Sequence, residues 1–212
     1  MDSKEDEIWN HQLPNDLPPP PPYSEEPSQA ASYSQEHDSH SASQTFFVDF
    51  TSWKLRHLNV TLGDRDGPLV YKADLTNRKP HMKFQIGQGE TSFATVVFRA
   101  WKPLIEINIK GQDIVLQRKT RRIREGIYES PNLGTTLTWQ NPNTRKLFDF
   151  DCTSRNGALL ARFTANQTWS MTKAGRLEIF GEKAANGEIL DELVVTGLAV
   201  AYWALCEHIA IN

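Results

Sequence analysis

A dense run of cations is the part of the sequence most able to bind another molecule. Residues 118–124 read Arg-Lys-Thr-Arg-Arg-Ile-Arg, so five of the seven carry a positive charge. Guanidinium groups pair with phosphate oxygens through two parallel hydrogen bonds, and each cation near an anionic leaflet contributes about 1 kcal/mol. Phosphoinositide headgroups or another anionic lipid surface are therefore the predicted ligands. Arg118 and Lys119 are expected to lead the contact. The predicted site consists of Arg118, Lys119, Arg121, Arg122 and Arg124.

Two other interpretations of this cationic run stay open. It is also typical of a solvated loop, and of a nuclear-import signal or nucleic-acid patch. Few aromatic residues stand close to the run to stack bases, which disfavours single-stranded nucleic acid. The N-terminus is acidic and has no apolar core, so the sequence predicts no secretory leader. We expect a cytoplasmic protein that associates peripherally with membranes, or a nuclear one if the run directs import.

A second recognition motif lies near the N-terminus. Five consecutive prolines precede Tyr23, and Pro20-Pro21-Pro22-Tyr23 fits the PPxY form that WW domains bind. Prolines hold a polyproline II helix before binding, so little conformational entropy is lost on docking. We predict that Pro20, Pro21 and Tyr23 bind a WW domain, such as that of a ubiquitin ligase. A stiff spacer is the alternative interpretation.

Composition divides the chain at about residue 44. Residues 1–44 contain seven of the twelve prolines and eight serines. Their formal charge is -8, whereas that of residues 45–212 is +5. A segment so poor in apolar surface cannot offset its ordering entropy. We therefore predict a disordered acidic tail over 1–44, able to compete for the cationic surface, and a folded domain over 45–212.

Short alternating segments dominate the folded part. Apolar and polar residues alternate from Phe46 onward in about eleven or twelve short runs separated by turn residues. Among them, 53–62 is predicted as one long strand and 146–151 as another. Such regular spacing of short strands is typical of a sandwich or a barrel.

The C-terminal segment selects between these two architectures. Residues 193–206 are apolar except for Thr196 and Gly197. This run is shorter than the roughly twenty residues that span a bilayer, and a helix apolar on all sides must be surrounded on all sides. The predicted fold class is mainly β: a closed antiparallel barrel of about 12 strands enclosing a hydrophobic C-terminal helix. A membrane tail anchor is the alternative for this segment.

The end of the chain resembles a known family. The strand 175–180 (Gly-Arg-Leu-Glu-Ile-Phe) followed by the Asp/Glu-marked apolar segment 189–200 is similar to the tubby C-terminal-like superfamily, which includes phospholipid scramblases and plant LURP-one-related proteins. Residues 50–55 and 67–71 are similar to uncharacterised fungal members. The resemblance implies a twelve-stranded barrel around the helix and, for some members, phosphoinositide binding. Scramblases carry an acidic calcium-binding segment, but here only Asp191 and Glu192 stand at that place.

Signatures of catalysis are not found in the sequence. There is no nucleophile elbow, no phosphate-cradling glycine loop and no histidine pair at metal-binding spacing. His57 and His81 are interpreted as polar-face residues, and Cys152 and Cys206 as small buried hydrophobes. We therefore expect a non-enzymatic protein without cofactor or metal, which binds anionic phospholipid. The alternative is an adaptor or ubiquitin-ligase substrate that acts through its PPxY motif without binding lipid.

Overall fold

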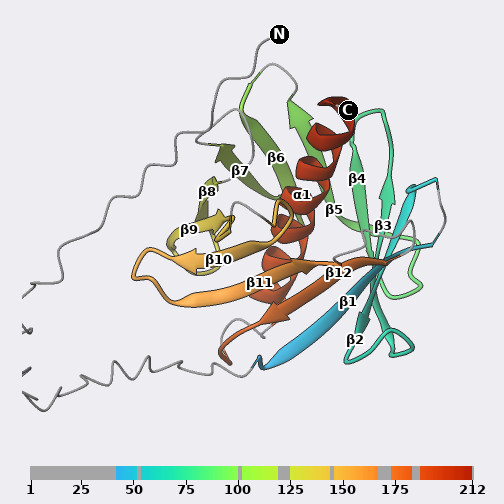
Figure 1. Ribbon diagram of the computed structural model, residues 1–212, viewed down its shortest axis with the longest axis horizontal. Helices are drawn as coiled ribbons and strands as arrows, with labels where there is room; N and C mark the ends of the chain where they lie inside the picture. The colour runs from blue at the N-terminus through green and yellow to red at the C-terminus, as the bar shows by residue number, and fades with distance from the viewer. Residues whose placement is uncertain are drawn as a thin grey trace, which may run out of the picture. The chain divides into compact units, whose positions relative to one another are not determined.

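In the computed structural model, the protein forms a closed β-barrel that surrounds one helix (Figure 1). The structure describes residues 42–51, 54–99, 102–118, 125–143, 146–166, 173–182 and 187–211. Residues 1–41 of the predicted tail, with Pro20, Pro21 and Tyr23, lie outside the described residues, and so do Lys119, Arg121, Arg122 and Arg124. Gln44, predicted as the last residue of the tail, instead begins the first strand. The strands are β1 (Gln44–Phe50), β2 (His57–Leu62), β3 (Leu69–Leu75), β4 (Met82–Ile86), β5 (Ser92–Arg99), β6 (Leu104–Ile109), β7 (Gln112–Arg118), β8 (Glu125–Ser130), β9 (Thr135–Gln140), β10 (Phe150–Ser154), β11 (Leu159–Ala165) and β12 (Lys173–Ile179).

Antiparallel pairing of neighbours in the sequence builds the barrel. Each strand pairs with the next, and β1 pairs with β12, with Gln44 opposite Ile179, to close the sheet. A closed barrel leaves no unpaired strand edge. Because every pairing is antiparallel, the strands run alternately up and down, and the connections between them alternate between the two ends of the barrel. The predicted barrel is confirmed.

Alternation along each strand fills the interior. In β1, for example, Phe46, Val48 and Phe50 point inward and are buried, whereas the residues between them are partly exposed. Successive side chains of a strand point to opposite faces of the sheet, so one face of the barrel wall is apolar and the other polar. The largest fully buried side chains are Trp139, Phe46, Phe84, Phe150 and Phe163.

The C-terminal helix α1 (Gly187–Ile211) runs through the middle of the strands, as Figure 1 shows. Residues 191–201 are buried on every side of the helix. Gly197 lets the backbone approach the ring of Trp139, where an added Cβ would lie 2.7 Å from a ring carbon. The hydroxyl of Thr196 accepts a hydrogen bond from Trp139 Nε1 at 3.0 Å and donates to the carbonyl of Glu192 at 2.8 Å. The predicted enclosed helix is confirmed.

Length and composition alone would allow α1 to cross a membrane over Gly187–Ile209. Most of that stretch is buried inside the barrel. The barrel wall therefore supplies the apolar surroundings that a membrane would otherwise have to provide.

Three details of the strands differ from the sequence-based expectation. The strand expected over 53–62 begins only at His57, because Leu55 adopts a left-handed conformation with φ of 52° that breaks an extended chain. The strand expected over 146–151 begins at Phe150, because residues 146–149 form a hydrogen-bonded turn. Strand β8 was not predicted, since Glu-Gly-Ile-Tyr-Glu-Ser contains only two large apolar residues.

Candidate functional site: the basic end of the barrel

The two ends of the barrel differ sharply in charge. We call the end where the odd-numbered strands finish the basic end, and the other the opposite end. By sequence, the connections at the basic end hold eleven Lys and Arg and one Asp, a formal charge of +10. Those at the opposite end hold four Lys and Arg and four Asp and Glu, a formal charge of zero. The connections at the basic end are 51–56, 76–81, 100–103, 119–124, 141–149 and 166–172; those at the opposite end are 63–68, 87–91, 110–111, 131–134, 155–158 and 180–186.

The predicted cationic run begins at the basic end. Arg118 is the last residue of β7, and Glu125 is the first residue of β8. Residues 119–124 therefore connect two strands whose ends meet at this rim. Their sequence supplies four of the eleven cations of the basic end. The strand order thus brings the predicted site to the same end of the barrel as cations from distant parts of the sequence.

Arg118 itself is turned toward α1. Its side chain is only 7% exposed and forms an ion pair with Glu207 of the helix. Its guanidinium lies 4.8 Å from the centre of the Trp203 ring, and Trp203 Nε1 donates a hydrogen bond of 2.7 Å to the same Glu207 oxygen. A cation stacked on an indole and paired with a carboxylate holds the last turns of the helix to β7. The expectation that Arg118 leads a lipid contact does not fit this burial, because its guanidinium is used in the contact with Glu207 and Trp203.

Other cations of the basic end stand in solvent. Arg56, Arg78, Lys79 and Lys102 are exposed, and they come from three different connections. Arg56 and Lys102 were not predicted as site residues, because isolated cations in short connections leave no pattern in the local sequence. Only the order of the strands brings them to one rim. Their charges add to one long-range field, which attracts anions more strongly than any one of them alone.

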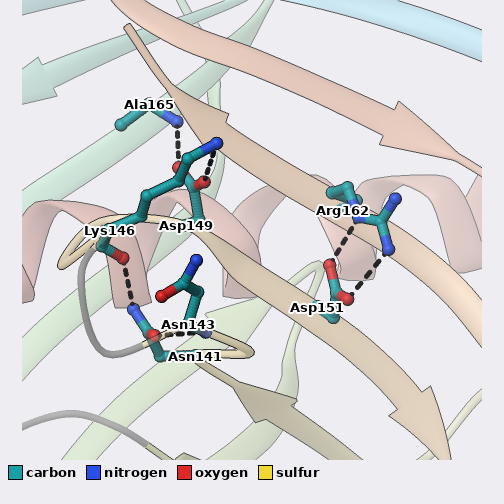
Figure 2. Close-up of polar contacts among 7 residues, drawn as sticks. All are labelled: Asn141, Asn143, Lys146, Asp149, Asp151, Arg162 and Ala165. Atoms are coloured by element: carbon teal, nitrogen blue, oxygen red, sulfur yellow. Dashed lines mark hydrogen bonds and ion pairs between the residues drawn. The ribbon is translucent and has the colours of Figure 1, made fainter. Parts of the chain in front are cut away.

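The connection between β9 and β10 is fixed by hydrogen bonds, which Figure 2 shows. Asn141 Nδ2 donates to the carbonyl of Lys146 at 2.8 Å, and the Lys146 ammonium lies 3.8 Å from Asp149. Asp149 in turn accepts a hydrogen bond of 2.9 Å from the backbone N–H of Ala165 on β11. The exposed ammonium of Lys146 is thereby held at the rim of the basic end.

Polar groups of the first half of α1 are tied to the opposite end. Asp191 accepts a hydrogen bond from Tyr71 Oη at 2.7 Å and pairs with the Lys110 ammonium at 2.8 Å. Asn132 Nδ2 donates to Glu192 at 2.8 Å. These acidic side chains, which mark the family resemblance, therefore fix the helix inside the barrel. Desolvation by burial, followed by the hydrogen bond to Asp191, raises the pKa of Tyr71 well above its usual value, so this phenol stays a neutral donor.

The interior offers little room for a small molecule beside the helix. The space next to Leu198 and Leu205 measures about 10 Å³, roughly that of one water molecule. Burial raises the pKa of the Cys152 thiol, which keeps this interior sulfur protonated and a poor nucleophile. Within the described residues, His, Cys, Asp and Glu form no group that could hold a metal ion.

Comparisons of the chain with protein-family models, with curated proteins and with solved structures gave no match. The chemistry of the barrel itself must therefore suggest the function. Its most distinctive property is the concentration of cations at the end where the C-terminus of α1 emerges.

Proposed function

We propose that the protein is a non-enzymatic binding protein that associates peripherally with anionic phospholipid surfaces through its basic end. The observation that carries the proposal is the contrast between a formal charge of +10 in the connections at one end and zero at the other. Charge confined to one end of a barrel attracts a flat anionic surface to that end alone.

The cations of 119–124 form the centre of the proposed contact. Lys119, Arg121, Arg122 and Arg124 follow directly after Arg118, which the Glu207 ion pair holds against the helix. Each cation close to an anionic leaflet contributes about 1 kcal/mol. The exposed Arg56, Arg78 and Lys102 add to the attraction over a wider area. In this arrangement the barrel stands on the membrane with the C-terminus of α1 toward the lipid.

The resemblance to the tubby C-terminal-like superfamily remains a prediction beside this proposal. It agrees with the proposed ligand, because the resemblance implies phosphoinositide binding by some members. The chain has only Asp191 and Glu192 where scramblases carry calcium ligands, and both are used inside the barrel. The proposal therefore involves no calcium and no transport of lipid.

Vesicle co-sedimentation of the full chain tests the proposal with a matched pair of variants. Arg121→Ala/Arg122→Ala removes two positive charges from the basic end, and Arg155→Ala/Lys183→Ala removes two from the opposite end. At about 1 kcal/mol per cation, the first change should weaken partitioning into anionic vesicles by roughly thirtyfold. The second should leave it unchanged within twofold.

Two results would contradict the proposal. One is sedimentation that does not depend on the anionic lipid content of the vesicles. The other is equal weakening by the two variants, because it would mean that net charge, and not the basic end, drives the binding. Rising salt should also weaken the association of the wild-type chain, since exposed charges are screened over about 8 Å at physiological ionic strength.

A second candidate function is favoured by Pro20-Pro21-Pro22-Tyr23. We propose that this motif binds WW domains, so that the chain acts as an adaptor or a ubiquitin-ligase substrate, with or without lipid. The tyrosine ring is expected to fill a pocket beside the proline groove. Capture of the full chain by an immobilised WW domain should be lost in Tyr23→Ala and kept in Tyr33→Ala. Equal capture of the Tyr23→Ala and wild-type chains would remove this function.

A further inference from the structure

Large aliphatic side chains are exposed next to the cations of the basic end. Four large hydrophobic residues are exposed among the described residues: Ile86, Val115, Leu147 and Ile209. Leu147, which is 50% exposed, lies in the connection between β9 and β10, and Ile209, which is 58% exposed, lies in the last turns of α1. Both segments are at the basic end. Ile86 stands at the opposite end, and Val115 is on the outer wall of β7.

The two segments that carry these side chains touch each other. The rings of Phe148 and His208, each adjacent in sequence to one of the two aliphatic residues, meet edge to face with their centres 5.5 Å apart. Single exposed apolar residues are normal on protein surfaces, whereas neighbouring ones beside a charged rim are typical of an interaction site. Leu147 and Ile209 are thus exposed on two segments of the basic end that contact each other.

The exposure of Leu147 is fixed by its surroundings. Its neighbour Lys146 accepts the hydrogen bond from Asn141, and Asp149 accepts one from Ala165 on β11, so both sides of Leu147 are tied down (Figure 2). Lys146, the preceding residue in the sequence, also has an exposed side chain. A leucine next to a lysine on a fixed turn suits a membrane interface, where apolar groups enter the lipid and cations stay at the headgroups.

We infer that the basic end inserts Leu147 and Ile209 into the interfacial layer of an anionic bilayer. This inference rests on the proposed function and makes it more specific: the ligand is a lipid surface, not a soluble phosphate compound or a nucleic acid. Those ligands offer charges to the cations but no apolar phase to the two aliphatic side chains. Adding apolar contact to electrostatic attraction is the usual basis of peripheral membrane binding.

An environment-sensitive dye such as NBD tests the insertion. It is attached to the full chain at Leu147→Cys or, as the matched control, at Ile86→Cys, whose native side chain is 53% exposed at the opposite end. Cys206→Ser removes the partly exposed thiol, and the buried Cys152 stays unlabelled. With vesicles of phosphatidylcholine and phosphatidylserine, the dye at 147 should brighten at least twofold, shift to the blue and be quenched by spin-labelled acyl chains. The dye at 86 should not change.

The outcomes separate the inference from the proposed function. If the labelled chain sediments with anionic vesicles while the dyes at 147 and 86 respond alike, insertion is wrong but electrostatic binding stands. If the wild-type chain does not sediment at all, both fail.

A matched pair of unlabelled variants gives a second measure. Leu147→Ser/Ile209→Ser should weaken vesicle binding by about tenfold and leave binding of inorganic polyphosphate unchanged, whereas Ile86→Ser should alter neither. Equal weakening for vesicles and polyphosphate would overturn the inference.

Discussion

The two ends of the barrel hold the same helix by different means and present different surfaces to solvent. At the opposite end, Asp191 and Glu192 of α1 are buried and bonded to Tyr71, Lys110 and Asn132. At the basic end, Arg118 and Trp203 Nε1 both bind the Glu207 carboxylate of the helix, and the connections there carry the exposed Arg56, Arg78 and Lys102.

Connections between strands are shorter on average at the opposite end, although 63–68 there and 51–56 at the basic end are both six residues long. At the opposite end, β6 and β7 are joined by the two residues 110–111, and β8 and β9 by the four residues 131–134. At the basic end, β9 and β10 are joined by the nine residues 141–149. Tight turns favour a rigid barrel, whereas longer connections on a rigid scaffold are where binding residues usually occur. The proposed function accordingly gives the opposite end mainly a role in stability and the basic end mainly a role in binding.

Reversing charge at the basic end should have the largest effect. Changing Lys119, Arg121, Arg122 and Arg124 to Glu should lower partitioning into anionic vesicles by at least about a thousandfold, since removing four cations alone costs about 4 kcal/mol. Co-sedimentation measures the loss, and circular dichroism should show an intact fold. As the control, Arg155→Glu/Lys183→Glu at the opposite end should bind within about fivefold of wild type. Comparable losses of vesicle binding in both variants would show that the two ends do not differ in their contribution to binding.

Removing the guanidinium of Arg118 should affect stability more than binding. Arg118→Ala takes away the buried partner of Glu207, and breaking a buried pair costs about 3 kcal/mol of unfolding free energy. Urea denaturation followed by tryptophan fluorescence measures this cost. Arg118→Met/Glu207→Leu should recover part of it, because an apolar pair of similar volume can replace a buried ion pair, whereas Trp203 Nε1 loses its acceptor. An Arg118→Ala chain as stable as wild type would show that the ion pair does not fasten the helix.

Weakening the opposite end should change stability alone. Asp191→Asn keeps an oxygen to accept the hydrogen bond from Tyr71 but removes the charge that pairs with Lys110. Because the lysine is half exposed, the loss should be about 1 kcal/mol. Urea denaturation gives the stability, and vesicle binding should stay within twofold of wild type. Binding that falls along with stability would mean that the two ends are not independent.

Acidification should have the smallest effect, at His81 of the basic end. Desolvation by burial, followed by the charge of Lys79, lowers the pKa of His81, whose Nδ1 accepts a hydrogen bond of 3.1 Å from the backbone N–H of Phe98. The unfolded chain then takes up this proton at a higher pH than the folded one. Stability is therefore lost as pH falls below about 6.5 toward the lowered folded pKa, by less than about 1 kcal/mol because the ring is partly exposed.

Urea denaturation at pH 7.5 and 5.5 measures this dependence. The drop in stability should be smaller in His81→Asn, which keeps a side-chain oxygen to accept the Phe98 hydrogen bond. An identical drop in both chains would assign the dependence to other groups.

The barrel and its enclosed helix could be predicted from the sequence, because both leave periodic signals. The alternation of apolar and polar residues indicated the strands. The apolar run broken only by Thr196 and Gly197 indicated a helix that must be buried on all sides. Strand β8 escaped prediction because its sequence holds few apolar residues, and the start of β2 was misplaced because nothing local shows that Leu55 turns left-handed.

Most of the candidate site could not be found in the same way. The run 118–124 is visible as a block of charge, but the role of Arg118 depends on Glu207, 89 positions away in the chain. Likewise, Arg56, Arg78 and Lys102 are ordinary loop residues until the strand order places them at one rim. The role of Arg118 and the common location of the other three cations both depend on contacts between residues far apart in the sequence. Neither leaves a pattern in the local sequence.

Hydrogen exchange of the full chain with and without anionic vesicles tests most directly whether the basic end faces the membrane. Backbone amides of 51–56, 76–81 and 119–124 should exchange more slowly when vesicles are present, while those of 63–68 and 155–158 should be unaffected. Protection of the opposite end, or equal protection of both ends, would contradict the account.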